Sequence, residues 1–306
     1  MQNLISDPVS MTSCRQEAYL LRLRRQFPFV YVKTLTRTAF GRSVYALQFG
    51  SGSRKLLITA GHHANETITS DAVWQWLFTF CNALLDGRTV CGAEARELYH
   101  NAMVYLVPLV NPDGADLAAG VCAPGSPEYR AAADIAVQYP DIPFPSGWKA
   151  NLAGVDLNLN YPAEWEQARK NKFALGFTGP APRDYVGGSP LDQPESAGMA
   201  GLTRLVDPRL TLSYHAQGEV IYWKFLDLTP VGAEEIGQKF SEVSGDALED
   251  TPFASGFAGY KDWFILTYDR PGYTIEVGLG ENPLPLSQFD EIYRKNLGIL
   301  TLGLTL

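Results

Sequence analysis

The pattern of apolar and polar positions along the chain predicts strands that alternate with helices. Residues 56–60 form an apolar run that is typical of a buried strand, and residues 67–85 carry apolar side chains at helical spacing. A strand, a helix and a second strand in this order indicate the α/β class, with a mixed, mostly parallel, twisted β-sheet flanked by helices. Further strands are predicted at 29–35, 43–49, 103–109, 210–214, 220–225 and 273–277, and further helices at 14–26, 195–205, 233–244 and 286–302.

The domain organisation follows from the length of the chain and from its loops. We expect one catalytic domain over residues 1–306, although this length also permits two modest domains. Residues 1–40 would supply the N-terminal helix and the first strand of that domain. Residues 110–190 are rich in glycine, proline, asparagine and aspartate, which predicts long irregular segments. Such segments usually form the rim of a functional site.

The composition excludes several kinds of partner. With 46% hydrophobic and 19% charged residues, the chain can bury a large core, and its formal net charge of -8 argues against nucleic acid and against an anionic membrane surface. The four cysteines lack both C-x-x-C spacing and the density of a disulfide scaffold, so reduced thiols are expected. No apolar run is long enough to span a membrane and the start lacks the pattern of a secretory signal, which favours the cytoplasm.

A histidine and a glutamate follow the predicted strand at 56–60. Gly61 permits a sharp exit from the strand, and His63 and Glu66 are three residues apart, so that they can hold one ion from a single turn. His215, after the predicted strand at 210–214, can complete a three-ligand zinc site with one position open to water, as in a zinc hydrolase. Alone, the His-x-x-Glu pair is weak evidence, because chance produces it often.

Further motifs occur in a characteristic order. An Asn-Pro-Asp-Gly motif occupies 111–114, a Gly-Val-Asp-Leu-Asn-Leu-Asn run occupies 154–160, and Glu276 is an isolated acid within the apolar strand at 273–277. Together with the earlier His-x-x-Glu pair and the later histidine, these segments resemble the M14 zinc carboxypeptidase family. The resemblance covers nearly the whole chain and implies the family's fold.

Longer strings indicate one branch of this family. Residues 148–151, 158–165, 182–187 and 214–223 resemble the γ-D-glutamyl-L-diamino acid endopeptidases, which act on peptidoglycan stem peptides. This resemblance implies zinc-dependent hydrolysis of the bond between γ-D-glutamate and the L-centre of meso-diaminopimelate. The implied partner is therefore a small peptide or muropeptide, and the sequence contains no signal for an oligomeric state.

The resemblance implies a zinc site with defined ligands. His63, Glu66 and His215 match the ligands of one zinc ion per chain. His62 is expected to be a packing neighbour, since the family pairing uses the histidine three residues before the glutamate.

The resemblance also implies the catalytic residues. Glu276 would act as general base and acid, and Asp156 would accept a hydrogen bond from the first zinc-binding histidine. Lys149 stands where the family has an arginine that stabilises the developing oxyanion; lysine keeps the charge but loses the bidentate geometry. Tyr260 lies in the region of the family's capping tyrosine, without a clean match.

Leu159 departs from the carboxypeptidase pattern. The family has an arginine here, beside the asparagine matched by Asn158, and this arginine clamps the C-terminal carboxylate of the substrate. Leucine cannot provide that grip, so ordinary C-terminal trimming is disfavoured. The carboxylates of D-glutamate and diaminopimelate then need other partners. The candidates are Arg183, Lys261 and Arg270 for the carboxylates, and Asp262 or Glu219 for the amine.

Three alternative functions remain open: a metallocarboxypeptidase of unusual C-terminal specificity, an aspartoacylase-like zinc deacylase, and a non-catalytic muropeptide-binding protein. The long strings at the rim speak against the deacylase. Retention of the three ligands together with Glu276 speaks against the loss of catalysis.

Overall fold

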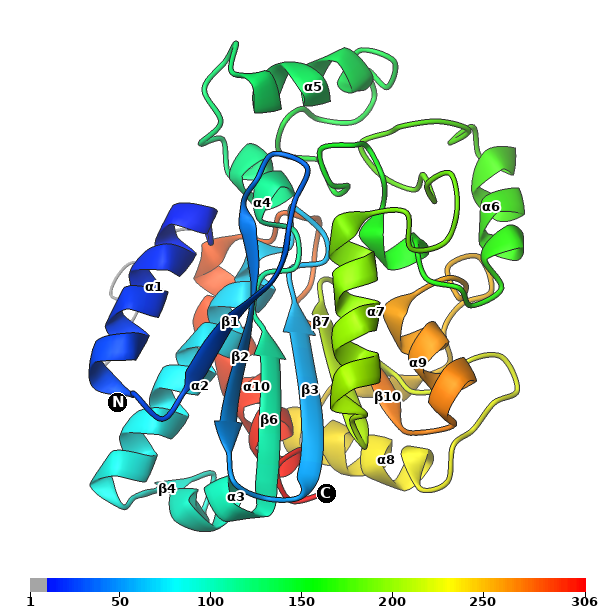
Figure 1. Ribbon diagram of the computed structural model, residues 1–306. Helices are drawn as coiled ribbons and strands as arrows, with labels where there is room; N and C mark the ends of the chain where they lie inside the picture. The colour runs from blue at the N-terminus through cyan, green and yellow to red at the C-terminus, as the bar shows by residue number, and fades with distance from the viewer. Residues whose placement is uncertain (1–9) are drawn as a thin grey trace.

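The structure, a computed structural model, describes residues 10–306 (Figure 1). The part of the domain prediction that concerns residues 1–9 lies outside the described residues. The strands are β1 (Tyr31–Arg37), β2 (Ser43–Gly50), β3 (Arg54–Ala60), β4 (Thr89–Val90), β5 (Ala93–Glu94), β6 (Ala102–Val107), β7 (Leu210–His215), β8 (Val220–Tyr222), β9 (Ala247–Glu249) and β10 (Gly272–Glu276). The helices are α1 (Ser13–Gln26), α2 (Thr67–Asp86), α3 (Ala95–Asn101), α4 (Pro112–Ala118), α5 (Pro127–Ala136), α6 (Trp165–Ala174), α7 (Pro194–Val206), α8 (Ala233–Ser244), α9 (Tyr260–Tyr268) and α10 (Phe289–Leu302), with 3-10 turns η1 (Leu157–Leu159) and η2 (Leu286–Gln288).

Eight of these strands form one mixed sheet in the order β1-β2-β6-β3-β7-β10-β8-β9. The pairs β3–β6, β3–β7, β7–β10 and β8–β9 are parallel. The pairs β1–β2, β2–β6 and β8–β10 are antiparallel. The predicted α/β class with a mixed, mostly parallel sheet is therefore confirmed.

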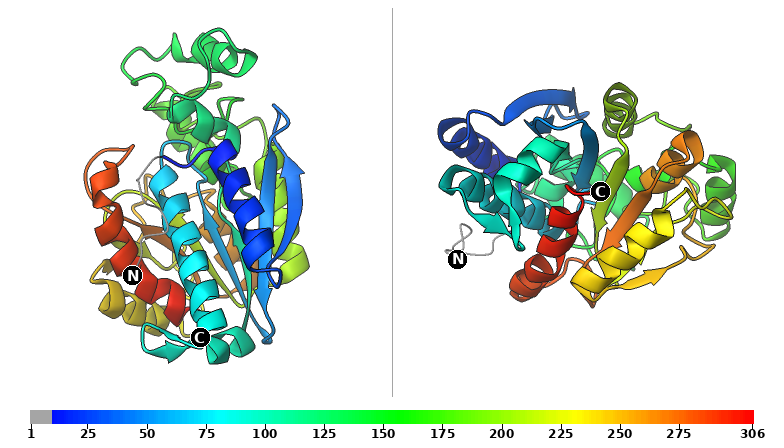
Figure 2. Two further views of the ribbon diagram at one scale, coloured as in Figure 1. Left: turned by 90° about the vertical axis from the view of Figure 1, so that its left-hand side faces the viewer. Right: turned by 90° about the horizontal axis from the view of Figure 1, so that it is seen from below.

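Helices cover both faces of this sheet (Figures 1 and 2). Leu56 and Ile58 of β3 point into a core shared with α1, α2, α8 and α10, whereas Leu57 points into the opposite core with α6, α7 and α9. This alternation follows from the two-residue period of a strand, and burial on both faces explains why consecutive residues of β3, Leu56, Leu57 and Ile58, are all apolar. No helix within residues 10–306 combines the length and apolar character that crossing a bilayer requires.

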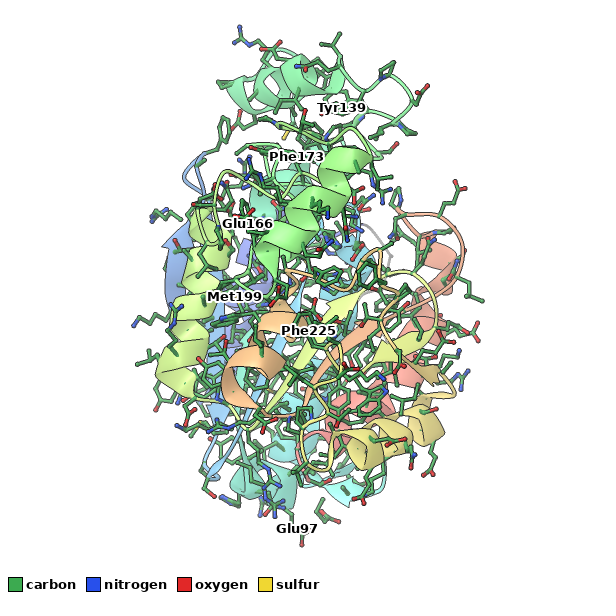
Figure 3. The ribbon with its side chains drawn as sticks, turned by 90° about the vertical axis from the view of Figure 1, so that its right-hand side faces the viewer. Glu97, Tyr139, Glu166, Phe173, Met199 and Phe225 are labelled. Carbon is green, nitrogen blue, oxygen red and sulfur yellow. The ribbon has the colours of Figure 1, made fainter. Side chains whose placement is uncertain are left out.

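The predicted irregular region at 110–190 is more regular than expected. It contains α4, α5 and α6, which the sequence analysis missed, because Pro112 and Pro127 mark first helical turns as well as breaks. Its upper part carries Tyr139 and Phe173, at the opposite end of the molecule from Glu97 of α3 (Figure 3). A third apolar cluster under this region includes Ala64 and Trp148, and so packs the segment around 148 against the turn after β3.

Two other differences concern the C-terminal half. The strand predicted at 220–225 ends at Tyr222, and β9 and α9 were not predicted. Helix α9 contains Trp263, Phe264 and Ile265, whose types favour a strand by intrinsic propensity. Its start is fixed instead by a local contact, since the Gly259 N–H donates to the Asp262 carboxylate over 3.1 Å.

Candidate active site

The site lies at one edge of the sheet, where the neighbouring parallel strands β3, β7 and β10 end. His215 and Glu276 are the last residues of β7 and β10 and face each other in register, and the turn after β3 carries His63. Gly61 starts this turn with φ +64°, and a Cβ there would come within 2.7 Å of Ser70 Oγ. Glycine therefore meets both a conformational and a packing requirement.

The structure brings His63, Glu66 and His215 together. Their ligand atoms all lie within 4.8 Å of one another, and all three residues are buried. Glu66 Oε1 lies 2.9 Å from His63 Nδ1, and Glu66 Oε2 lies 3.1 Å from His215 Nδ1. The two Nδ1 atoms are 3.1 Å apart. Two imidazole nitrogens and a carboxylate that converge in this way form the donor set of a catalytic zinc site.

The hydrogen bonds around His63 and His215 orient the Nδ1 atoms of both rings toward the cluster. His63 Nε2 donates to Asp156 Oδ1 over 3.1 Å, which places the proton on Nε2 and leaves Nδ1 free to bind a cation. His215 Nε2 lies 3.4 Å from Ser213 Oγ, on the side away from the cluster. The donor chemistry of this chain therefore fits zinc.

The charges of the cluster are strongly coupled. Burial disfavours the imidazolium, but the carboxylates of Glu66 and Asp156 together outweigh it and raise the pKa of His63 to about 8. Burial likewise disfavours the Glu66 anion, yet His63 and Lys149 hold the pKa of Glu66 well below its usual range. For Asp156, burial is again outweighed, mainly by His63, so that its pKa is also lowered. Both carboxylates are thus charged at neutral pH.

Glu276 lies beside this cluster with a different electrostatic environment. It is partly exposed to a cavity, and its side chain accepts no hydrogen bond from residues 10–306. Burial, and then the negative charge of Glu66, raise the pKa of Glu276 to about 8, while Lys149 and His63 oppose this shift. A carboxyl group with a pKa near neutrality is suited to take up and release a proton.

Lys149 is tied to the turn that carries His63. The Ala64 N–H donates to the Lys149 carbonyl over 3.0 Å, and Asn111 Nδ2 bridges the carbonyls of His62 and Ala150. Lys149 Nζ lies 3.6 Å from Glu66 Oε1. Burial lowers the pKa of this ammonium, but the nearby carboxylates, Glu66 first and then Asp156 and Glu276, together outweigh it, so that its pKa is raised and it stays charged.

A charged cavity of about 160 Å³ adjoins Glu276 and His63. Asn158, Leu159, Arg183 and Lys261, which the sequence predicts to bind the substrate, all line it. Their role in substrate binding stays a prediction. Lys261 is only 3% exposed and forms an ion pair of 2.7 Å with Asp262 Oδ1.

Arg270 is a correction to the predicted site. It lies before β10, at the opposite edge of the sheet from Glu276, where it binds Asp207 at 2.7 Å. The strand itself separates the two residues, since six residues of extended chain span roughly 20 Å. Glu219 pairs with Lys295 and does not line the cavity.

Tyr260 and His62 are both held in the interior by packing. Tyr260 is fully buried and its hydroxyl lies 2.9 Å from Thr203 Oγ1, so it does not reach the cavity as a capping side chain. His62 is also fully buried and stacks on His215, with Nε2 3.2 Å from the Tyr161 hydroxyl.

Sequence reasoning missed several residues of the site. Asn282 Nδ2 donates to the Ala216 carbonyl and to Glu66, at 2.5 and 3.4 Å. Lys172 and Asp184 form an ion pair of 2.5 Å in the charged cavity, which Tyr222 also lines. Neither Asn282 nor Lys172 belongs to a motif, so no local signal distinguishes them from surface residues.

Comparison with known proteins places the chain in a family. The family model for zinc carboxypeptidase, Peptidase_M14, matches residues 16–298. The chain is 40% identical over 285 residues to gamma-D-glutamyl-L-diamino acid endopeptidase 1 of Lysinibacillus sphaericus, covering 93% of this chain and 70% of the relative. It is 37% identical over 277 residues to the uncharacterized protein YqgT of Bacillus subtilis, covering 90% and 72%.

Solved structures share the fold at low identity. Bovine thrombin-activatable fibrinolysis inhibitor, in its complex with tick carboxypeptidase inhibitor, superimposes with a TM-score of 0.69 and 16% identity over 97% of each chain. The chain thus belongs to the zinc carboxypeptidase family. It is a zinc metallopeptidase by this membership, as the sequence analysis predicted.

Proposed function

We propose that this protein cleaves the bond between γ-D-glutamate and the L-centre of meso-diaminopimelate in peptidoglycan stem peptides. The main support is its similarity over 93% of the chain to a relative named as a γ-D-glutamyl-L-diamino acid endopeptidase. We also propose that one zinc ion per chain is held by His63, Glu66 and His215, and that the protein works in the cytoplasm. Four unpaired cysteines, two of them exposed, suit a reducing compartment.

In this proposal, the side chains around the cluster divide the work of hydrolysis. Bound zinc would polarise the scissile carbonyl and lower the pKa of a water molecule. Glu276 takes a proton from the attacking water and delivers it to the leaving amine, a role to which its raised pKa is suited. Asp156 holds the imidazole of His63 in one tautomer and one orientation.

Lys149 would stabilise negative charge that develops on the carbonyl oxygen. Its ammonium remains charged and 22% of its side chain is exposed, so it can reach a substrate while Glu66 anchors it. A fixed positive charge in a largely buried site stabilises an oxyanion strongly, because little water competes for it.

The charged cavity supports a substrate that carries several charges. Leu159 occupies the position where the family's carboxypeptidases have a carboxylate-binding arginine, and it is only 7% exposed. Beside it stand Lys261 with Asp262, and Lys172 with Asp184. Paired charges of both signs suit the side chain of diaminopimelate, which ends in an amine and a carboxylate. Asn158, whose Oδ1 accepts the Tyr260 N–H at 3.0 Å, would shape the entrance.

Mass spectrometry on defined peptides tests this proposal. The zinc-loaded protein is incubated with L-Ala-γ-D-Glu-diaminopimelate and with the corresponding tetrapeptide that ends in D-Ala. We expect L-Ala-γ-D-Glu as the released fragment. Release of D-Ala alone from the tetrapeptide would instead indicate a carboxypeptidase, and intact substrates would indicate another substrate class.

A further inference from the structure

A second cavity, of about 510 Å³, opens from the same reaction centre. It shares Lys149, Arg183 and Glu276 with the charged cavity. Its remaining lining comes mainly from Asn65, from the loop at 141–147 and from the loop that carries Glu281 and Asn282. We call it the acceptor cavity. Tyr139, two residues before Asp141, marks its loop in the upper part of Figure 3.

Four side chains of the acceptor cavity have oxygen atoms without a protein donor. Asp141 and Glu281 form no hydrogen bond or ion pair with any of residues 10–306. Asn65 is 6% exposed, and its Oδ1 has no donor. Asn282 is held by its Nδ2, which donates to the Ala216 carbonyl, and its Oδ1 is also without a donor. Asp141 and Glu281 are exposed to solvent, whereas the Oδ1 atoms of Asn65 and Asn282 are buried, where an unpaired polar atom is costly. This part of the cavity is therefore suited to a ligand rich in N–H groups.

The charges of the acceptor cavity are arranged in a definite order. Lys149 and Arg183 stand at the end it shares with the reaction centre, and among residues 10–306 no other lysine or arginine lines it. The acids Asp141 and Glu281 line the remainder. A suitable ligand therefore carries a carboxylate close to the scissile bond and a cation further from it. In a γ-linked glutamyl peptide, the α-carboxylate of D-glutamate lies close to the scissile carbonyl, and the residue before it ends in an α-ammonium group if its nitrogen is free.

We infer that the acceptor cavity binds the free α-ammonium group of the residue that precedes the γ-linked glutamate. This inference rests on the proposed function and specifies its substrate: a peptide with an unblocked N-terminus. An ammonium offers three N–H donors and a positive charge to the unpaired oxygens, whereas an amide nitrogen offers one donor and no charge.

The inference places the enzyme in a sequence of reactions. In a stem peptide still attached to its glycan strand, the nitrogen of the first residue is part of an amide. A reaction that hydrolyses this amide, and so frees the peptide from the sugar, must therefore precede cleavage of the γ-D-glutamyl bond by this protein.

Three peptides that differ only at the first nitrogen test the inference. They are L-Ala-γ-D-Glu-diaminopimelate with a free amine, its N-acetyl derivative, and a propionyl analogue that lacks the nitrogen altogether. We expect kcat/KM to be about ten- to a hundredfold higher for the free amine than for either of the others, the range expected when a charged hydrogen-bonding group is lost. The propionyl analogue is no larger than the natural peptide, so its slow cleavage reports lost charge and not lack of room.

A pair of matched variants locates the effect. In Asp141→Asn with Glu281→Gln, the preference for the free amine should fall severalfold toward unity. The control, Glu234→Gln with Glu235→Gln on α8, changes the net charge equally at the other end of the molecule and should keep the preference (Figure 1). Zinc content and melting temperature are measured for both.

The outcomes separate the two proposals. Equal kcat/KM for all three peptides, or a preference that the Asp141 and Glu281 variant retains in full, overturns the inference and leaves the proposed function intact. If none of the three peptides is cleaved at the γ-D-glutamyl bond, the proposed function itself fails.

Discussion

Asp156 accepts a hydrogen bond from His63 across 93 residues of sequence, with 3.1 Å between Oδ1 and Nε2. Its carboxylate also receives the backbone N–H groups of Asn158 and Asp184, at 3.1 and 3.3 Å. These contacts join η1 and the loop after α6, both of which line the charged cavity, to the zinc ligand His63. Asp156 therefore fixes the imidazole and the cavity wall at the same time.

We predict that Asp156→Asn weakens zinc binding by about 10- to 100-fold, the usual cost of removing a partner of a ligand. The amide keeps the size of the side chain, but it can turn its NH₂ group toward Nε2 and so favour the wrong tautomer of His63. Competition with a chelator measures the affinity. The role assigned to Asp156 is wrong if the variant binds zinc as tightly as the wild type.

Glu276→Gln should leave zinc affinity and melting temperature nearly unchanged and lower kcat by ~10²–10⁴, the contribution of a positioned proton carrier. Glutamine keeps the shape of the side chain but cannot exchange a proton. Steady-state kinetics on the γ-linked peptide provide the test, with zinc content measured in parallel. Near-normal turnover would mean that another group carries the proton.

Zinc binding should release protons at pH 7. His63 and Glu276 both have pKa values of about 8 in the metal-free protein, so both are largely protonated at pH 7. A cation requires the neutral imidazole and, through its charge, lowers the pKa of the nearby carboxyl group. Below pH 8 the zinc affinity should therefore decrease as the pH decreases.

Calorimetry in buffers of different ionisation enthalpy counts the released protons. In Glu276→Gln the count at pH 7 should be smaller by up to one, because only His63 remains to titrate. An identical count in the two proteins would show that Glu276 is already ionised before the metal binds.

Leu159→Arg should destabilise the protein by about 1–3 kcal/mol without producing carboxypeptidase activity. The side chain of Leu159 is only 7% exposed and belongs to an apolar cluster with Tyr161 and Trp263. A guanidinium there would also face Lys172 and Lys261 in the charged cavity. Leu159→Met, which conserves volume, is the control and should cost less than about 1.5 kcal/mol. Efficient trimming of α-linked C-terminal residues by Leu159→Arg would contradict this view of the cavity.

Asp71 provides a prediction away from the site. It is 3% exposed, and burial raises its pKa to about 7, although Arg15 at 3.9 Å opposes the shift. Because the folded pKa exceeds the value of about 3.9 in an unfolded chain, the favourable contribution of the neutral acid is complete only below pH 4 and is lost as the pH rises through 7.

Asp71→Asn cannot ionise, so it should gain stability relative to the wild type as the pH rises. We expect this gain to be roughly 2 kcal/mol larger at pH 8 than at pH 5, as measured by denaturant unfolding. A difference between the two proteins that does not change with pH would mean that Asp71 is ionised in the folded state throughout.

The elements that carry the reaction centre could be predicted because their sequences are locally consistent. The centre of strand β3 is apolar on both faces, α2 has helical periodicity, and the ligands stand at the end of a strand or within the turn that follows one. Helix α9 could not be predicted in this way, since its aromatic and β-branched residues favour a strand. Its start is stabilised instead by the contact between Gly259 and Asp262 and by the distant Asn158, which accepts the Tyr260 N–H.

The charged cavity was only partly predictable. Lys172 and Asp184 meet because α6 folds back over the loop that follows it, and no spacing in the sequence reports this contact. The error for Arg270 was avoidable, since a residue at the start of a parallel strand lies at the opposite edge of the sheet from the residue that ends it.

The central claim is that the enzyme is specific for a γ-D-glutamyl bond to a diamino acid. The most direct test compares kcat/KM of the zinc-loaded protein on L-Ala-γ-D-Glu-diaminopimelate with kcat/KM on the α-linked isomer of the same composition. We predict preference for the γ-linked peptide by up to ~10⁴, since a site built around several charged groups leaves them unpaired when the substrate presents its charges elsewhere. Equal rates, or faster cleavage of the α-linked isomer, would contradict the account and indicate an ordinary carboxypeptidase.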